Sequence, residues 1–216
     1  LKILNPIYSV DEIKKIMGKD SRGVLINSPE DLLNLVLECL REYQTYLTGK
    51  ENPRVEDLWN LNKTSLTHKS EEDFSDHIKA FLDLKMKSSC IIINREVQLN
   101  RGINGTSGAR TDLWVNVYSR DRESKYSLCI EVKGSWNTSA PTAIKEQLVD
   151  KYMGSGGADA GIYLVGWFDS KKYPQQENMW NNDREWANAD LDAKVQEQRQ
   201  KEPLLMKLII NCDYRI

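Results

Sequence analysis

Two carboxylates and one amine stand where the sequence predicts neighbouring β-strands, Asp112 at the start of one strand and Glu131 and Lys133 at the end of the next. Side chains alternate across a strand, so Glu131 and Lys133 share one face. If residues 119–125 form the hairpin turn, the pairing places Asp112 opposite Val132, next to Glu131, within a register error of a residue. The sequence therefore predicts that the two acids lie adjacent on a sheet.

Two adjacent carboxylates repel each other, and a divalent cation between them reverses the sign of that interaction. Mg²⁺ prefers hard oxygen ligands, typically one or two carboxylates together with waters and phosphate oxygens. Lys133 would balance the acids and would orient or activate a water on the metal. Carboxylate, carboxylate and lysine around a metal form a set that can cleave a phosphodiester.

An alternative is that Asp112 and Lys133 are ordinary charges on the surface of a sheet, where cross-strand pairs contribute a fraction of a kcal/mol. Asp112, however, is flanked by apolar residues and Trp114, and residues 128–132 read as a buried strand. A charge at the end of a buried strand destabilises the fold unless it has a partner or a function. We therefore favour the metal site.

The elements that position these residues follow from the spacing of apolar side chains. The sequence predicts a helix from Ser70, strands over 90–99, 111–118 and 126–132, a helix over 141–153, a strand over 160–168, a charged helix over 183–201 and a strand over 204–211. This order is αβββαβ with an appended αβ, which predicts an α/β fold.

The first 65 residues are predicted to form a helical N-terminal extension, 1–65, preceding a core over 66–216. Within it the pattern predicts an amphipathic stretch over 10–17, a brief strand over 22–26, a helix over 28–49 and a polar connection over 60–69. Ser28 and Pro29 are typical of a helix N-cap and first helical position.

On these residues the sequence resembles the PD-(D/E)xK nuclease superfamily. The resemblance rests on Asp112 followed by Glu131-Val132-Lys133 on a β-hairpin between two helices, and it covers roughly residues 70–168. Thr111 stands where the family has proline before the aspartate. The resemblance implies a restriction-endonuclease-like core, in which helices flank a central mixed sheet.

The resemblance implies a role for each matched residue. Asp112 and Glu131 would bind Mg²⁺ or Mn²⁺, and the main-chain carbonyl of Val132 would add a third oxygen. Lys133 would position the attacking water, and Gln147 on the next helix would hold the substrate or Lys133.

Two further residues are candidates for binding substrate. Gln147 and Tyr152 resemble the Gln…Tyr motif of the RecB-like branch, with Lys151 where an apolar residue is usual. Plain helix surface and core are the alternatives for both. Trp136, just after the Glu131-Val132-Lys133 motif, could stack a base, although core packing explains most tryptophans.

The superfamily often has one more acid on the first core helix, and here three residues compete for that place. On helical spacing Glu71 lies on the apolar stripe, whereas Glu72 and Asp76 lie on the solvent side. Asp76 is nearer in sequence to the following strand, as in relatives. We favour Glu71 and keep Asp76 as its rival, while capping and helix-dipole roles remain the alternative for Glu71 and Asp73.

The composition excludes several classes of protein. Of 216 residues, 40% are hydrophobic and 29% are charged, which is typical of a packed protein rather than a disordered one. The net charge of −2 and the pI near 5.8 exclude diffuse coating of nucleic acid by basic charge, although a bound metal would bring its own positive charge.

The sequence also limits location and partners. Its apolar runs are far shorter than the roughly 20 residues of a membrane helix, and a secretory signal is not expected, so we expect no membrane partner. The four cysteines form no CxxC pattern, which argues against zinc and for reduced, buried thiols in a cytoplasmic protein. The start at Leu1 rather than Met suggests a piece of a longer polypeptide.

These observations predict a Mg²⁺- or Mn²⁺-dependent nuclease that hydrolyses phosphodiester bonds, with DNA favoured over RNA as its partner. By analogy the chain resembles an effector module of a larger bacterial antiviral-defence or repair protein, with the rest of that polypeptide or a second copy as further partners. The alternative is a catalytically degenerate nuclease fold that serves as a nucleic-acid or protein interaction module.

Overall fold

The computed structural model describes residues 26–50, 53–62, 65–87, 91–98, 110–118, 124–169 and 178–214. Its elements are helix α2 (Pro29–Thr48), 3₁₀ helix η1 (Val55–Leu58), strands β1 (Trp59–Asn62) and β2 (Ser65–His68), helix α3 (Glu71–Lys85), strands β3 (Ile91–Gln98), β4 (Arg110–Tyr118) and β5 (Lys125–Gly134), π-helix η3 (Ile144–Ser155), strand β6 (Ala160–Trp167), helix α4 (Arg184–Gln198) and strand β7 (Leu205–Asn211).

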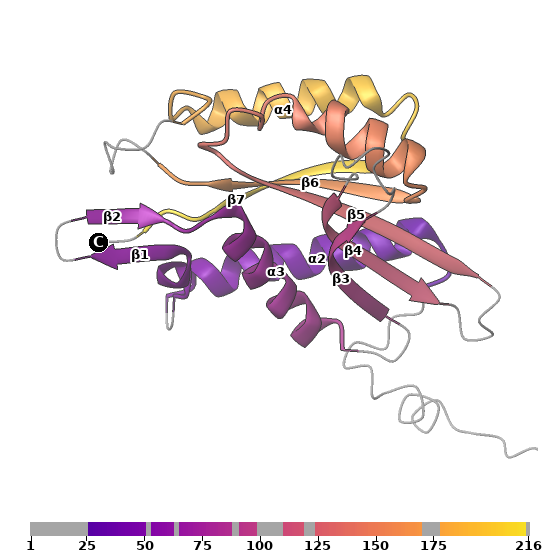
Figure 1. Ribbon diagram of the computed structural model, residues 1–216, viewed down its shortest axis with the longest axis horizontal. Coiled ribbons are helices and arrows are strands. Elements are labelled where there is room, and N and C mark those ends of the chain that lie inside the picture. The colour runs from indigo at the N-terminus through magenta and orange to yellow at the C-terminus, as the bar shows by residue number, and fades with distance from the viewer. Residues whose placement is uncertain are drawn as a thin grey trace, which may run out of the picture.

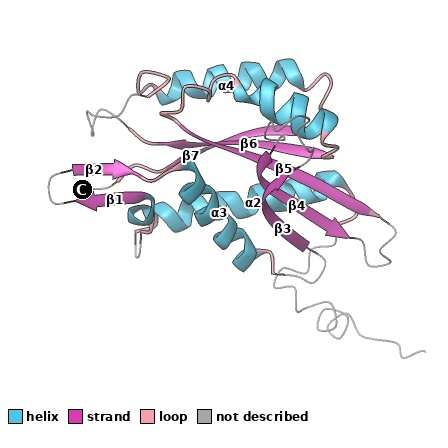
Figure 2. Ribbon diagram, viewed as in Figure 1, coloured by secondary structure: helices cyan, strands magenta, loops and turns pink. Residues whose placement is uncertain are grey.

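A mixed five-stranded sheet in the order β3-β4-β5-β6-β7 forms the centre of the molecule. The β3–β4 and β4–β5 pairs are antiparallel, and the β5–β6 and β6–β7 pairs are parallel. Helices α2 and α3 cover one face, and η3 and α4 cover the other (Figures 1 and 2). The predicted α/β fold and the predicted element order from α3 onward are confirmed.

The strands at the centre of the sheet are buried on both faces because helices cover both. Every residue of β6 is buried, and so is every residue of β5 from Ser127 onward. Near-continuous apolar sequence is typical of such strands. A charged side chain in β5 is consequently shielded from water, which matters for the site below.

Helices α2, in the predicted N-terminal extension, and α3, at the start of the predicted core, both have side-chain caps. The Ser28 hydroxyl accepts a hydrogen bond from Asp31 N at 3.1 Å, with Pro29 at the first helical position. Ser70 and Asp73 form a reciprocal capping box, in which the Ser70 hydroxyl accepts from Asp73 N at 3.1 Å. The predicted helix starts are confirmed, and Asp73 has the capping role.

The apolar face of α2 lies in the same hydrophobic core as the sheet. Leu32, Val36 and Leu40 are fully buried together with Val115 and Ile162 of the sheet. The division at residues 65 and 66 stays a prediction. The stretch over 10–17 and all of the 22–26 strand except Ile26 lie outside the described residues.

The polar segment over 60–69 is not the predicted connection. It contains most of an antiparallel hairpin, in which β1 and β2 pair from Trp59 with His68 to Asn62 with Ser65. Strands of four residues are too short to show a clear period of two in sequence. The Trp59 indole nitrogen fixes the hairpin to the end of the sheet by donating to Cys212 O at 2.8 Å.

The predicted register of β4 and β5 is wrong by one residue. The observed pairs run from Tyr118 with Lys125 to Leu113 with Ile130, so Asp112 aligns with Glu131 rather than Val132. In this register the two residues of each pair lie on the same face of the sheet. Leu113 and Ile130, for example, both lie in the core on the α2 and α3 side.

The predicted helix over 141–153 begins later and is wider than expected. Residues 138–142 form turns, and Ile144–Ser155 is a π-helix, a rare form that is frequent at functional sites. Its buried side chains, which include Leu148 and Tyr152, pack against β5 and β6.

Two further predictions concern membrane-spanning helices and cysteines, and their outcomes apply to the described ranges only. No helix within them is both long enough and apolar enough to cross a bilayer. Cys39, Cys129 and Cys212 are buried free thiols, as predicted, and Cys90 lies outside the described residues.

Candidate active site

Strands β4 and β5 stop pairing with each other before either strand ends. Their last paired residues are Leu113 and Ile130. Beyond them β4 continues along β3 to its own first residue, and β5 continues along β6 to Gly134. The two strands therefore part and leave a gap in the sheet, here called the fork, which begins at Asp112 and Glu131.

The Asp112 carboxylate, on β4, reaches across the fork to the main chain of β5. Its Oδ2 accepts a hydrogen bond from the main-chain nitrogen of Val132 at 2.8 Å. The N–H and C=O of one strand residue point to the same neighbour, so the Val132 carbonyl also faces the fork. Burial raises the pKa of Asp112, the Val132 N–H and the Lys133 ammonium oppose the rise, and the Glu71 charge adds to it.

Glu131 and Lys133 form an almost fully buried ion pair. The Lys133 ammonium donates to Glu131 Oε1 at 2.7 Å. The Lys133 side chain is 9% exposed and the Glu131 side chain is 2% exposed. Glu131 Oε2 is buried and has no hydrogen-bond partner among the described residues. Burial and the charge of Asp112 raise the pKa of Glu131 to about 8, against the opposing effect of Lys133.

The pKa of Lys133 depends on two opposing effects, burial and the charges of the surrounding carboxylates. Burial lowers the pKa of Lys133, but the neighbouring carboxylates of Glu131, Glu71 and Asp112 outweigh burial and hold that pKa above its usual value. The ammonium is therefore charged at neutral pH. The charge of Glu71 contributes to the pKa shifts of Asp112, Glu131 and Lys133, so the four charged groups lie close together at the fork.

Glu71 is the helix acid that reaches this cluster. It lies in the first turn of α3, and its Oε1 accepts from Gly134 N at 2.7 Å. Its Oε2 lies 3.9 Å from the Lys133 ammonium. Asp76 instead pairs with Arg95 on β3 at 2.5 Å, and Glu72 is exposed. The apolar stripe thus identified which of the three acids faces the sheet.

Asn137 is a site residue that sequence reasoning missed. Its side-chain nitrogen lies 2.9 Å from each oxygen of Glu71. Its Oδ1 accepts from the main-chain nitrogen and the hydroxyl of Ser139, both at 2.8 Å, which fixes the orientation of the amide. The Asn-x-Ser spacing signals a local turn, but nothing in the sequence indicates the contact to Glu71.

Two buried tyrosines line the same region. Burial raises the pKa of Tyr152, and the charges of Glu131 and Asp112 add to the rise. The same causes raise the pKa of Tyr163, whose hydroxyl donates to Ala140 O at 2.5 Å. Tyr152 was predicted from its motif. Tyr163 was missed, because a tyrosine in an apolar strand reads as core.

Gln147 is not connected to the charged cluster. It is half-buried on η3 and makes no hydrogen bond to the four charged groups in the part of the chain that the structure describes. Its role in holding substrate or Lys133 stays a prediction.

The Trp136 indole packs against the end of β5. It stacks on the His68 ring with centroids 3.4 Å apart and an interplanar angle of 13°, and it meets Phe168 edge-on at 4.7 Å. A Cβ on Gly134 would collide with the same indole. Trp136 thus has a packing role, and both it and His68 remain half-buried.

The charged cluster can be tested against the needs of a divalent cation. In the described ranges, no three His, Cys, Asp or Glu side chains are grouped so that they could hold a metal ion. The acids are held apart by protein partners, Asp112 by a main-chain N–H and Glu131 by Lys133. However, Mg²⁺ uses only one or two carboxylates, and the unpartnered Glu131 Oε2 is a hard oxygen that fits it.

The comparison with known proteins gives a family and no activity. No protein of curated function matches the chain. The sequence model of a family described as a domain of unknown function, DUF8371, matches residues 32–170, well over half of the 216 residues. The match contains the fork and the acid of α3, and the chain therefore belongs to the DUF8371 family.

Proposed function

We propose that this protein is a metal-dependent nuclease that hydrolyses phosphodiester bonds of DNA. The observation that carries the proposal is the convergence of three carboxylates and one ammonium at the fork, where the pKa values of Asp112, Glu131 and Lys133 are shifted by burial and by neighbouring charges. An ordinary surface ion-pair cluster would not be this deeply buried. Perturbed, mutually coupled groups in one place are typical of functional sites.

The balance of charge supports a divalent cation as the missing partner. Asp112, Glu131 and Glu71 carry three negative charges when ionised and Lys133 carries one positive charge, which leaves a net charge of −2. Burial raises the pKa of Glu131 most and the charge of Asp112 adds to the rise, so protonation of Glu131 is one way to relieve the excess. A cation of charge +2 relieves it without protonation.

The residues present would divide the work as follows. Asp112, Glu131 and the Val132 carbonyl would hold the cation, which when bound would supply positive charge to the phosphodiester and acidify a water. Lys133 would hold that water in line and stabilise negative charge on the phosphate. Glu71, oriented by Asn137, would keep the ammonium directed toward the fork.

The finer description of the fold belongs to the same proposal. The order of the elements, a helix, three strands, a second helix and then a parallel strand, supports a restriction-endonuclease-like core. The divergence of β4 from β5 supports the same fold. Three buried free thiols support a cytoplasmic location. The acidic chain provides little long-range attraction for DNA, so targeting would come from the rest of a larger defence or repair polypeptide or from a second copy.

The direct test is cleavage of supercoiled plasmid with Mg²⁺ or Mn²⁺. Asp112→Asn and Lys133→Met should each lower the rate at least 100-fold, since each removes a group from the reacting centre. Lys125→Ala, an exposed lysine on the same strand, is the matched control and should cleave normally. Single-stranded DNA and RNA serve as parallel substrates. Cleavage that persists in EDTA and in both variants would rule the proposal out.

One observation favours the second candidate, a degenerate nuclease fold that binds nucleic acid or protein. Glu131 is closely paired with Lys133 at 2.7 Å, which gives the ammonium and one carboxylate oxygen a partner without a metal. This candidate predicts binding of DNA without cleavage and melting temperatures unaffected by Mg²⁺.

A further inference from the structure

Helices α2 and α3 pack against each other on one face of the sheet and enclose a groove toward their C-terminal ends (Figure 1). The volume of this groove is about 690 Å³. Its two walls are fixed to each other by side chains. The Tyr43 hydroxyl and His77 Nδ1 are hydrogen-bonded at 2.7 Å, and the centroids of the Tyr46 and Phe81 rings lie 5.2 Å apart. The groove is therefore formed before any partner binds.

Apolar side chains on the groove are exposed to an unusual degree. The α3 wall consists of one helix face, with the spacing i, i+3, i+4 and i+7, formed by His77, Ala80, Phe81 and Leu84. Phe81 is nearly buried, whereas Tyr46 on the α2 wall is 40% exposed and Leu84 is 71% exposed. Leu84 is the most exposed of the large hydrophobic side chains in the described ranges.

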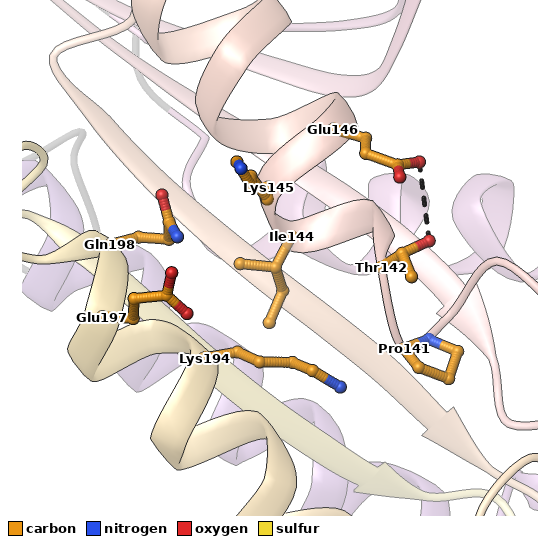
Figure 3. Close-up of a pocket in the computed structure, with 8 residues that line it drawn as sticks. All are labelled: Pro141, Thr142, Ile144, Lys145, Glu146, Lys194, Glu197 and Gln198. Atoms are coloured by element: carbon orange, nitrogen blue, oxygen red, sulfur yellow. Dashed lines mark hydrogen bonds between the residues drawn. The ribbon is translucent and has the colours of Figure 1, made fainter.

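The cavity between η3 and α4, on the other face of the sheet, has a different lining (Figure 3). Its volume is about 200 Å³, and charged side chains from both helices line it, among them Lys145, Lys194 and Glu197. Charged side chains are stable in water, so this lining gives no reason to expect a partner. Exposed apolar surface, in contrast, is typical of an interaction site, and it is the α2–α3 groove that has it.

The charges on the groove are balanced. The Lys85 ammonium lies 3.0 Å from Glu42 Oε2, and each side chain is 38% exposed. The same ammonium lies 5.5 Å from the centroid of the Phe81 ring. Burial lowers the pKa of His77, against the opposing charge of Asp57, so the imidazole adds no positive charge at neutral pH. The groove therefore offers a partner one acid and one base and has no net charge.

We propose that this groove is the interface of a two-fold dimer, in which it packs against the same groove of a second copy of the chain. A two-fold interface uses one patch on both subunits, so the patch must contain both halves of every contact. Leu84 supplies a projecting side chain, and the small, exposed Ala80 one turn earlier leaves room beside Phe81 for the leucine of the second copy. Glu42 and Lys85 supply an acid and a base that can pair with the base and the acid of the other chain.

The arrangement of the helices supports the same partner. Two helices from each copy would form a four-helix arrangement, in which side chains at helical spacing pack ridges into grooves. Each copy presents two such faces, one from α2 and one from α3, and the contact of Tyr43 with His77 holds them in place. Little ordering would therefore be needed on association. This dimer does not depend on the nuclease proposal, because the groove contains none of the residues of the fork.

Analytical ultracentrifugation of the metal-free protein over a range of concentrations tests the dimer. We expect the mass to rise from one chain to two. Leu84→Gln and Ala80→Gln should each raise the dissociation constant at least tenfold, because a two-fold interface contains each substitution twice. Both side chains are exposed, so the monomeric variants should unfold at the same urea concentration as the monomeric wild type. Trp186→Gln, which changes a 48% exposed side chain on α4, is the matched control and should dimerise normally.

Cysteine cross-linking tests which surface is used. A mixture of Leu84→Cys and Thr45→Cys chains should form a cross-linked pair on oxidation, because the two positions lie on opposite walls of the groove. Gln196→Cys, exposed on α4, should cross-link with neither. The mass of a single chain at every concentration would overturn the proposal and assign the groove to a different partner. A dimer that is unaffected by both Leu84→Gln and Ala80→Gln would place the interface elsewhere and would overturn it as well.

Discussion

At the scale of single residues, the fork is a balance between three acids that repel one another and one lysine that holds them. Glu131 is the residue where this balance is least complete, since one of its oxygens is buried without a hydrogen-bond partner in the described ranges. The predictions at this scale concern the proton on Glu131 and the contacts that orient Glu71.

Glu131 should make the stability of the metal-free protein fall as pH rises. Its pKa is about 8 in the folded state against an ordinary value of 4.5, so the folded state holds the extra proton between these values. The free energy of unfolding should therefore decrease from about pH 4.5 to pH 8, by roughly 2–5 kcal/mol. Urea unfolding across this range should show the slope for the wild type and a flatter profile for Glu131→Gln.

A divalent cation should reverse this trend, because it favours the ionised carboxylate. The increase in melting temperature on adding Mg²⁺ should be larger at pH 8.5 than at pH 6. Glu72→Gln, which changes an exposed acid next to Glu71, should respond to pH and to Mg²⁺ as the wild type does. An increase that is independent of pH would show that the cation does not bind at Glu131.

Asn137→Ala should weaken both stability and activity. The amide bridges Glu71 and Ser139, and its loss leaves a partly buried carboxylate with fewer donors. We expect a loss of about 1–3 kcal/mol in unfolding free energy and a cleavage rate reduced more than KM is changed. Thr138→Ala, at the exposed neighbouring position, should leave the free energy of unfolding within about 0.5 kcal/mol of the wild type.

At the scale of elements, the site depends on the ends of strands and helices rather than on their middles. β5 ends at Gly134, where the main-chain nitrogen binds Glu71 and the Trp136 indole covers the α-carbon. The β1–β2 hairpin adds His68, which stacks on the same indole. The end of β5 thus joins α3, the hairpin and the fork.

Gly134→Ala should destabilise the protein by about 1–3 kcal/mol, because the new methyl group collides with the Trp136 indole. The same substitution in a Trp136→Ala background should have a smaller effect, since the collision partner is gone. Urea unfolding of the four proteins gives the coupling energy. An equal effect in both backgrounds would show that the indole is not the cause.

The sequence allowed the elements to be predicted better than their contacts. Caps at Ser28 and Ser70 are local signals, so both helix starts were predicted. The relative placement of Asp112 and Glu131 depended on the turn between their strands, whose length the pattern leaves uncertain by one residue. Asn137 and Tyr163 meet the cluster through contacts far apart in sequence, which spacing cannot show.

At the scale of the whole molecule, the fork between β4 and β5 is reached by Glu71 from α3, on the opposite face of the mixed sheet from η3 and α4. The last residue of the edge strand β7 is protected, since the Gln44 side chain accepts from Asn211 N at 2.5 Å and donates to Asn211 O at 3.2 Å. A side chain there takes the place of a further strand.

Removing this protection should change the behaviour of the whole molecule. Gln44→Ala exposes the Asn211 backbone groups on an edge strand, and exposed edges promote association. We expect about 1 kcal/mol of lost stability and a concentration-dependent rise in mass by light scattering. The same mass for the variant and the wild type at all concentrations would show that the amide does not protect the edge.

The central claim is that the fork binds a divalent cation, and Mn²⁺ binding measured by electron paramagnetic resonance tests it most directly. The wild type should bind Mn²⁺ at the fork at pH 8, with Mg²⁺ competing, and Asp112→Asn should weaken this binding at least tenfold while remaining folded. Wild-type protein that leaves all Mn²⁺ free in solution, or Asp112→Asn that binds it equally well, would contradict the claim.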